Sequence, residues 1–274
     1  MTLTATGFDW VRQLVHRESA IVLSPGKEYL VEARLLPIAR SMGLSDVGRL
    51  VDSVRTRPSS EATRRIVEAR TTNETSWFRD GDPFTALPST VLPSLLATRG
   101  PTERLRIWSA ACSSGQEPYT IAMLLEDALP GASTRVAITA TDLSREMVER
   151  TRAGRFSQLE VNRGLPAAML VRHFTRVGNE WQVSPDLRRM VTESECNLAA
   201  PLPRMGPFDV VYLRNVLIYF DLATKQAILQ RVRQLMRPDG WLFLGAAETT
   251  LGVDDNWERV VLGRGSAYRP RKGN

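Results

Sequence analysis

The sequence contains few of the residues from which metal sites, disulfide frameworks and membrane spans are built. It has two cysteines and two histidines, and Cys112 and Cys196 lie far apart in no metal-ligand spacing. We interpret both as free thiols that act as small packing residues, as expected of a cytosolic protein. His173 is interpreted as structural. No apolar run approaches the ~20 residues that span a bilayer, and the first ten residues resemble no signal peptide.

Lysine is also scarce. Three of the 36 basic residues are lysines, against 30 acidic residues, and the net charge is +6. The arginines are spread along the whole chain, without a stripe in which basic and aromatic residues alternate. This pattern argues against a nucleic-acid partner and permits an acidic protein partner.

The glycine fingerprint of dinucleotide-binding turns is absent, but a related arrangement is present. The apolar run Leu105–Ala111 predicts a buried strand, and a turn of small residues with Gly115 alone leads into a helix. A second run, Val136–Thr141, ends at Asp142. Such a turn presents backbone N–H groups to a nucleotide-like ligand, and the acid is placed to accept hydrogen bonds from ribose hydroxyls. Taken alone, the stretch also fits an ordinary strand–helix unit without a ligand.

Residues up to about 87 are predicted to be helical, and the domain that they form is expected to span 1–87. Ser45 is the expected N-cap of a helix over 46–55, and Pro37 is expected to kink or split the helix that precedes it. On that preceding helix, Lys27 and Arg34 share a face and Arg40 points elsewhere. These basic residues fit either a solvated face or a docking surface for an acidic helix. The expected helices cover 9–17, 27–42, 46–55 and 60–69.

The remainder, 88–274, alternates strands with helices, which predicts an α/β fold with a mostly parallel sheet. A turn is expected at 237–240, and the chain is expected to close with a hairpin over 257–262 and 266–269. A β-hairpin over 170–183, turning at Gly178-Asn179, predicts a small inserted subdomain at about 170–190. The expected strands cover 105–111, 136–141, 209–213 and 241–245, and the expected helices 144–153 and 222–236.

Five segments, in the same order and with similar gaps, together resemble the chemotaxis receptor glutamate methyltransferases (the CheR family), which use S-adenosylmethionine. The resemblance implies a Rossmann-like methyltransferase domain joined to a small N-terminal all-helical domain and carrying an inserted small β-subdomain. The segments are Thr71–Arg79, Ile107–Tyr119, Thr141–Leu143, Phe208–Asp221 and Phe243–Glu248.

The same resemblance implies roles for individual residues. Arg79 and Tyr219 are the implied catalytic residues, and Arg79 carries a donor fork suited to the carboxylate of the cofactor or of the receptor glutamate. Asp142 would bind the ribose and Glu117 the cofactor's ammonium, and S-adenosylhomocysteine would be the product. The implied cofactor contacts are Asn73, Thr75, Arg79, Glu117, Asp142, Asn197, Leu198, Asn215 and Val216.

The implied partner is the cytoplasmic helical bundle of a chemoreceptor, bound through Lys27, Arg34 and Arg40 and, in some relatives, through the β-subdomain. Pro37 and Ile38 stand where relatives carry more positive charge. Two alternatives stay open at this point. One is a methyltransferase for nucleic acid or a small molecule, although the Asn/Asp-Pro-Pro-aromatic signature of amino-methylating nucleic-acid enzymes is absent. The other is a cofactor-binding adaptor without catalysis.

Overall fold

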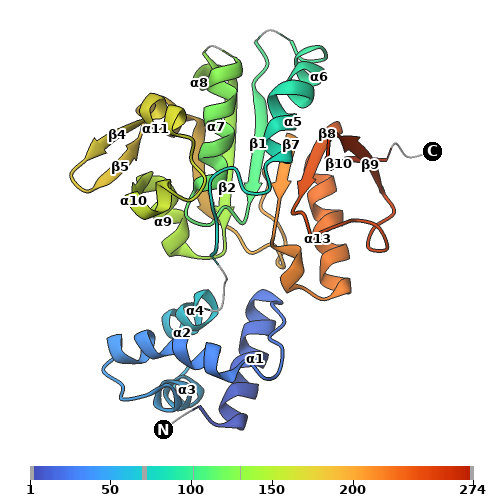
Figure 1. The fold of residues 1–274 in the computed structure, drawn as a ribbon. Helices are drawn as coiled ribbons and strands as arrows, with labels where there is room; N and C mark the ends of the chain where they lie inside the picture. The colour runs from blue at the N-terminus through green and yellow to red at the C-terminus, as the bar shows by residue number, and fades with distance from the viewer. Residues whose placement is uncertain (1–2, 70–72, 101, 130, 272–274) are drawn as a thin grey trace.

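The computed structural model describes residues 3–69, 73–100, 102–129 and 131–271, which form a helical domain and a larger α/β domain (Figure 1). The helical domain packs its four helices around apolar stripes such as Val31, Leu35 and Ile38. The helices are α1 (Ala5–Ser19), α2 (Glu28–Ser41), α3 (Val47–Thr56) and α4 (Ser60–Glu68).

One expectation for this domain is narrowed and another is wrong. Helix α2 continues through Pro37 and is therefore not split; the proline lies on the exposed side, and Leu35 and Ile38 are buried on both sides of it. The N-cap of α3 is Asp46, whose carboxylate accepts from the backbone N–H of Arg49 at 3.0 Å. The Ser45 hydroxyl donates to Asp46 instead, at 2.8 Å.

The α/β domain is built on a seven-stranded sheet in the order β6-β2-β1-β7-β8-β10-β9. The first five strands are parallel, while β10 is antiparallel to both β8 and β9. This arrangement confirms the predicted mostly parallel sheet and the closing hairpin. The strands are β1 (Leu105–Ala110), β2 (Val136–Asp142), β6 (Val191–Glu195), β7 (Phe208–Leu213), β8 (Met236–Leu244), β9 (Trp257–Leu262) and β10 (Gly265–Pro270).

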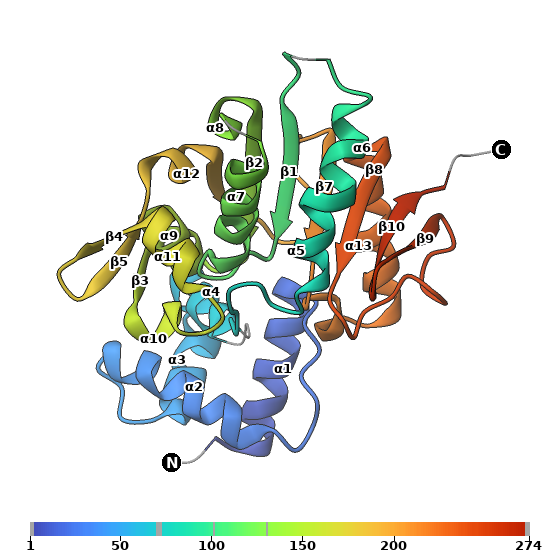
Figure 2. The ribbon, with the colours of Figure 1, turned by 45° about the horizontal axis from the view of Figure 1, so that its top comes forward.

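Alternate residues of the central strands enter two separate cores. Val210 and Tyr212 of β7 join one core, and Val211 and Leu213 join the other, which also takes in the helical domain. Helices α5 to α7 cover the first face (Figure 2), and α13 covers the second. Because both faces are covered, every residue of β7 is buried. The helical elements are α5 (Asp82–Ala86), η1 (Leu87–Val91), α6 (Leu92–Leu96), α7 (Gln116–Ala128), α8 (Ala132–Arg135), α9 (Arg145–Ala153), α12 (Pro185–Met190), η2 (Leu217–Tyr219) and α13 (Leu222–Gln234).

The inserted subdomain is a three-stranded antiparallel sheet in the order β3-β5-β4. The predicted hairpin is confirmed and turns at Gly178-Asn179, whereas residues 170–173, which were expected to be strand, end helix α11. The helix extends that far because Ala167, Ala168, Met169 and Leu170 are strong helix formers. The elements are β3 (Arg155–Ser157), α10 (Gln158–Val161), α11 (Ala167–His173), β4 (Phe174–Val177) and β5 (Glu180–Val183).

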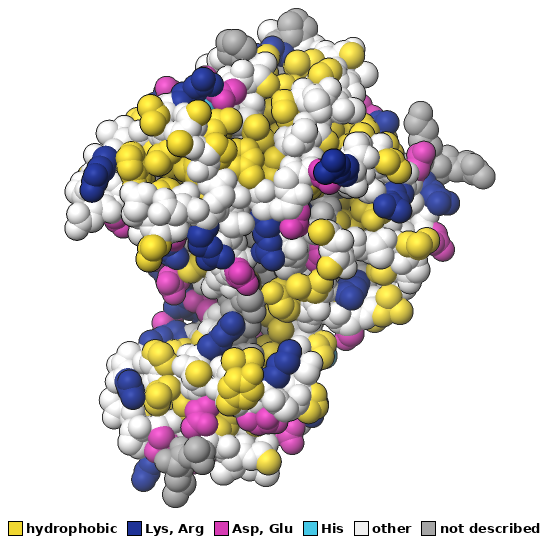
Figure 3. Space-filling view, in the orientation of Figure 1, with side chains coloured by type: hydrophobic (Ala, Val, Ile, Leu, Met, Phe, Trp, Pro, Cys, Tyr) yellow, Lys and Arg dark blue, Asp and Glu magenta, His cyan; other side chains and the backbone are white. Residues whose placement is uncertain are grey.

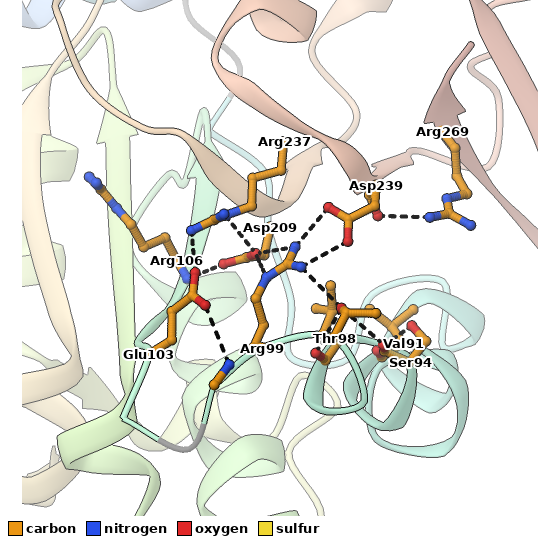
Figure 4. Close-up of polar contacts among 12 residues, drawn as sticks. Val91, Ser94, Thr98, Arg99, Glu103, Arg106, Asp209, Arg237, Asp239 and Arg269 are labelled. Carbon is orange, nitrogen blue, oxygen red and sulfur yellow. Dashed lines mark hydrogen bonds and ion pairs between the residues drawn. The ribbon is translucent and has the colours of Figure 1, made fainter. Parts of the chain in front are cut away.

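The turn expected at 237–240 is instead a bulge inside β8. Between the pairs Phe208–Met236 and Val210–Trp241, β7 advances two residues and β8 advances five. The bulge brings Asp239 against Arg99 at the amino end of the sheet (Figure 4). We call this group of charged residues the amino-end cluster: Arg99, Glu103, Asp209, Arg237 and Asp239.

Candidate functional site

A pocket opens at the carboxyl end of the parallel strands, next to β1. Strand β1 has β2 as its neighbour on one side and β7 on the other. This is the topological switch point at which doubly wound sheets bind ligands. The empty space of the pocket, with its open mouth included, is about 930 Å³. All ten site residues named from the sequence line this pocket: Asn73, Thr75, Arg79, Glu117, Asp142, Asn197, Leu198, Asn215, Val216 and Tyr219.

The loop after β1 is held in an unusual backbone shape. Ala111 and Ser113 have positive φ angles of 60° and 51°, and Gly115 has a φ of 100°. A Cβ at Gly115 would approach the Thr151 side chain to 3.1 Å, so both the backbone angle and the space favour glycine. The backbone N–H of Ser113 donates to Asp142 at 2.8 Å, which ties the loop to the end of β2.

Asp142 lies at the carboxyl end of β2 and is 5% exposed. Its two oxygens accept one backbone N–H each, from Ser113 at 2.8 Å and from Ser144 at 2.9 Å. Burial raises the pKa of this carboxyl above its usual range. Each oxygen keeps a second lone pair, so the carboxylate retains capacity to accept hydroxyl donors from a ligand.

Glu117, in the first turn of α7, is held at both oxygens. One accepts from the Ser109 hydroxyl and the other from the guanidinium of Arg214, each at 2.8 Å. Arg214 also donates to the Asp80 carboxylate at 2.9 Å. No role was expected for Arg214, although it lies inside one of the family-like segments.

The stretch between the domains forms one wall of the pocket. The carbonyl of Asn73 accepts from the Ser113 hydroxyl at 2.9 Å, and Arg79 donates to the carbonyl of Glu74 at 2.7 Å. Trp77 anchors the stretch, because its indole N–H donates to the carbonyl of Glu160 in the β-subdomain at 3.0 Å. The first residues of the family-like segment, Thr71 and Thr72, lie outside the described residues.

The loop between β7 and α13 carries Asn215, Val216 and Tyr219. Glu248, which sequence reasoning did not assign, accepts the backbone N–H groups of Asn215 and Leu217, both at 2.7 Å. It also accepts from Ile218 and Gly245. Gly245 leaves no room for a side chain, since a Cβ there would lie 2.6 Å from the Asn215 amide nitrogen. One carboxylate therefore fixes the loop that presents Tyr219.

The helical domain closes the pocket on the remaining side. The carbonyl of Tyr219 accepts from the backbone N–H of Val22 at 2.9 Å. The Asn197 amide donates to the carbonyl of Glu18 at 2.8 Å, and its oxygen accepts from Ala199 at 2.9 Å. The Asn197 side chain is thus largely engaged with backbone partners, and beside it Leu198 provides an apolar wall.

The cysteines and His173 behave as the sequence suggests. Burial raises the pKa of Cys196 to about 11 and that of Cys112 well above its usual range, so both thiols are protonated at neutral pH. His173 is buried 3.2 Å from Asp127 and does not line the pocket. Within the described ranges, no cluster of three or more metal-ligating side chains occurs. No helix of the described chain is long and apolar enough to cross a bilayer.

Comparisons with known proteins agree with this architecture. The family model described as "CheR methyltransferase, all-alpha domain" matches residues 6–69, and "CheR methyltransferase, SAM binding domain" matches residues 73–264. Chemotaxis protein methyltransferase 1 of Pseudomonas aeruginosa is 39% identical over 99% of this chain and 100% of its own. Chemotaxis protein methyltransferase Cher2 of Pseudomonas putida is 38% identical over 96% and 98%. The chemotaxis protein methyltransferase of Vibrio parahaemolyticus is 38% identical over 94% of each chain.

The chemistry of the pocket fits S-adenosylmethionine. Asp142 and Glu117 provide carboxylates for hydroxyl and ammonium donors, and Arg79 provides a guanidinium for a carboxylate. Leu143 and Leu198 provide apolar walls suited to a purine ring. With the family models covering both domains, the chain belongs to the CheR methyltransferase family and is an S-adenosylmethionine-dependent methyltransferase of chemotaxis.

Proposed function

We propose that the protein methylates glutamate side chains of chemoreceptors in the cytoplasm and forms glutamate methyl esters. The observation that carries this proposal is that Arg79 and Tyr219, from two distant segments of the chain, line the same pocket as Asp142 and Glu117. A guanidinium fork and a phenol are groups that orient a carboxylate without removing a proton from it.

The cofactor supplies an electrophilic methyl group bonded to a sulfonium. A glutamate is already ionised at pH 7, so its oxygen needs no general base, and no histidine is among the pocket-lining residues. Arg79 orients the acceptor carboxylate, Tyr219 donates to it, and Val216 excludes water. Alignment of this kind contributes up to ~7–11 kcal/mol toward lowering a barrier, so the mechanism relies on positioning and needs no proton transfer.

We further propose that the receptor's acidic helical bundle docks on the helical domain. Lys27 at the start of α2, together with Arg34 and Arg40, is exposed, and Figure 3 shows basic side chains on this lobe and beside the hollow between the lobes. Of the two positions where relatives carry more positive charge, Pro37 is exposed, but Ile38 is buried in the core. The departure from relatives therefore removes one surface position from the docking face.

The test is transfer of labelled methyl from S-adenosylmethionine to receptor cytoplasmic fragments, followed by mild base, which releases methanol from a methyl ester. We expect base-labile label, and we expect Arg79→Ala and Tyr219→Phe to slow transfer by about 100-fold, as misaligned reactants do. Arg104→Ala and Tyr29→Phe, which change exposed side chains outside the pocket, are matched controls.

The other candidate functions give different results in the same assay. Base-stable label, or label on RNA, contradicts glutamate esterification and favours another substrate. Cofactor binding without transfer to any receptor fragment favours an adaptor. Wild-type rates in the Arg79→Ala or Tyr219→Phe proteins contradict the roles given to those side chains.

A further inference from the structure

Arg214 is a buried charged residue of the pocket. It follows the last residue of β7, and its side chain is 1% exposed. Its guanidinium contacts two elements of the site: one nitrogen donates to Glu117 on α7, and another donates to the carbonyl of Arg79 at 2.6 Å and to Asp80. Arg214 thus joins the wall that follows β1 to the wall between the domains.

The exposed fractions of these side chains indicate which of them can contact a ligand. The side chains of Glu117 and Asp80 are 13% and 30% exposed, so the acids are more open than the arginine between them. The Phe84 ring lies 5.1 Å from the guanidinium carbon and encloses the cation from another side. One arginine against two carboxylates leaves a net negative charge, which suits a ligand ammonium.

Glu117 has no freedom to adjust in this arrangement. Ser109 holds one of its oxygens and Arg214 holds the other, so the carboxylate is oriented before any ligand arrives. The same guanidinium fixes the carbonyl of Arg79, and therefore the backbone that carries the Arg79 side chain. Arg214 therefore sets the position of Glu117, the group assigned to the ammonium of the cofactor.

We propose that Arg214 is a positioning residue for the amino-acid end of S-adenosylmethionine, acting through the Glu117 carboxylate. The inference rests on the proposed placement of the cofactor's ammonium at Glu117. Because Arg214 acts through this carboxylate, it affects ligands that carry an amino-acid end and has little effect on ligands that lack one.

The test compares binding of two ligands by calorimetry: S-adenosylhomocysteine, which has the amino-acid end, and 5′-methylthioadenosine, which lacks it. Arg214→Met removes the charge and the donor fork, and we expect it to weaken binding of S-adenosylhomocysteine by about 100-fold, because the Glu117 and Asp80 carboxylates lose their shared partner. Binding of 5′-methylthioadenosine should change by less than about 3-fold, because the ribose is bound elsewhere, at Asp142.

Arg214→Lys keeps the charge and loses the planar fork, and it keeps the test decisive if the methionine variant does not fold. We expect it to weaken binding of S-adenosylhomocysteine by about 10-fold, since one lysine ammonium cannot reach all three acceptors in the same geometry. In turnover assays its KM for S-adenosylmethionine should rise by the same factor while kcat changes less than about 3-fold. Arg99→Lys, which makes the same change in the amino-end cluster, is the matched control and should leave both affinities unchanged.

Equal weakening of both ligands in the folded Arg214→Lys protein overturns the proposal, because a general structural defect does not distinguish them. Unchanged affinity for S-adenosylhomocysteine also overturns it. The result is independent of the methyl acceptor: failure of wild-type protein to methylate receptor glutamates contradicts the proposed function, whereas the two-ligand comparison still tests Arg214.

Discussion

The two ends of the parallel sheet hold similar charged groups with different outcomes. At the amino end, Arg99 lies between Asp209 and Asp239, and all three of its guanidinium nitrogens donate to a neighbour. At the carboxyl end, Arg214 lies between Glu117 and Asp80, but its Nε has no partner within the described residues.

The surroundings differ more than the residues do. Asp209 is 0% exposed and serves only the chain's own donors, including the backbone N–H of Arg106. Glu117 lines a pocket. A buried arginine between two acids therefore indicates a binding site only where the acids face a cavity. Elsewhere the same group of side chains links one strand to the next.

The largest effect should come from breaking the amino-end cluster. Arg99→Met leaves Asp209 buried without its main charged partner, and such a loss costs about 3–5 kcal/mol of the free energy of unfolding. Denaturant titration measures it. The comparison predicts that the folded fraction binds S-adenosylhomocysteine with wild-type affinity. A variant that loses affinity without losing stability would mean that the two ends do not differ in this way.

The next largest effect comes from Glu248, the carboxylate that holds the loop after β7. Glu248→Ala removes the acceptor of four backbone N–H groups, and we expect a loss of about 1–3 kcal/mol in stability. It should also lower kcat by about 10–100-fold, because Tyr219 is no longer held in place. Single-turnover kinetics and thermal unfolding measure the two effects separately. A kcat equal to that of wild type would show that the loop keeps its shape without Glu248.

The smallest effect concerns the pH dependence of the stability that Asp239 contributes in the amino-end cluster. Hydrogen bonds from Arg99 hold the pKa of Asp239 below its ordinary value of 3.8. A lowered pKa in the folded state stabilises the protein above that ordinary value, and the contribution is lost as the pH falls through the folded value. The Asp239 side chain is 38% exposed, so solvent screening limits the contribution to about 1 kcal/mol or less.

Asp239→Asn should therefore be slightly less stable than wild type at pH 7, and the difference should shrink as the pH falls below the ordinary pKa of 3.8 and through the lower folded value. Urea titrations at several pH values measure this. A difference that persists in acid would assign the effect to packing of the bulge instead of to the charge.

The strands that could be predicted from the sequence are those whose signal lies within one short segment of the chain. Strands β1, β2 and β7 are short runs in which most residues are apolar, and Asp142 closes one of them. Edge strand β6 was missed because only Val191 of its five residues is apolar. The bulge at 237–240 resembled a turn because Pro238, Asp239 and Gly240 are turn residues, and only its pairing with β7 identifies it as strand.

The candidate site shows the same limit. The pocket residues could be named from the resemblance to the family, and all of them except Asn197 and Leu198 lie in one of the five segments that carry it. Arg214 and Glu248 could not be assigned roles, because their partners are distant in the chain: Glu117 is 97 residues from Arg214, and Asn215 is 33 from Glu248. Pairings at that range depend on how the strands are ordered in the sheet, which residue patterns alone do not specify.

The packing of Trp77 limits which β-subdomains from relatives could replace the one in this protein. Its ring packs edge-on against Phe156 at 4.8 Å and Phe174 at 5.5 Å, both from the β-subdomain. At Gly164, where φ is +98°, a Cβ would lie 2.5 Å from the Trp77 carbonyl oxygen. A β-subdomain grafted from a relative must therefore bring a glycine at this position and aromatic rings that accept the tryptophan. Without them the graft displaces the stretch that carries Arg79, so the subdomain and the interdomain stretch are inherited as one unit.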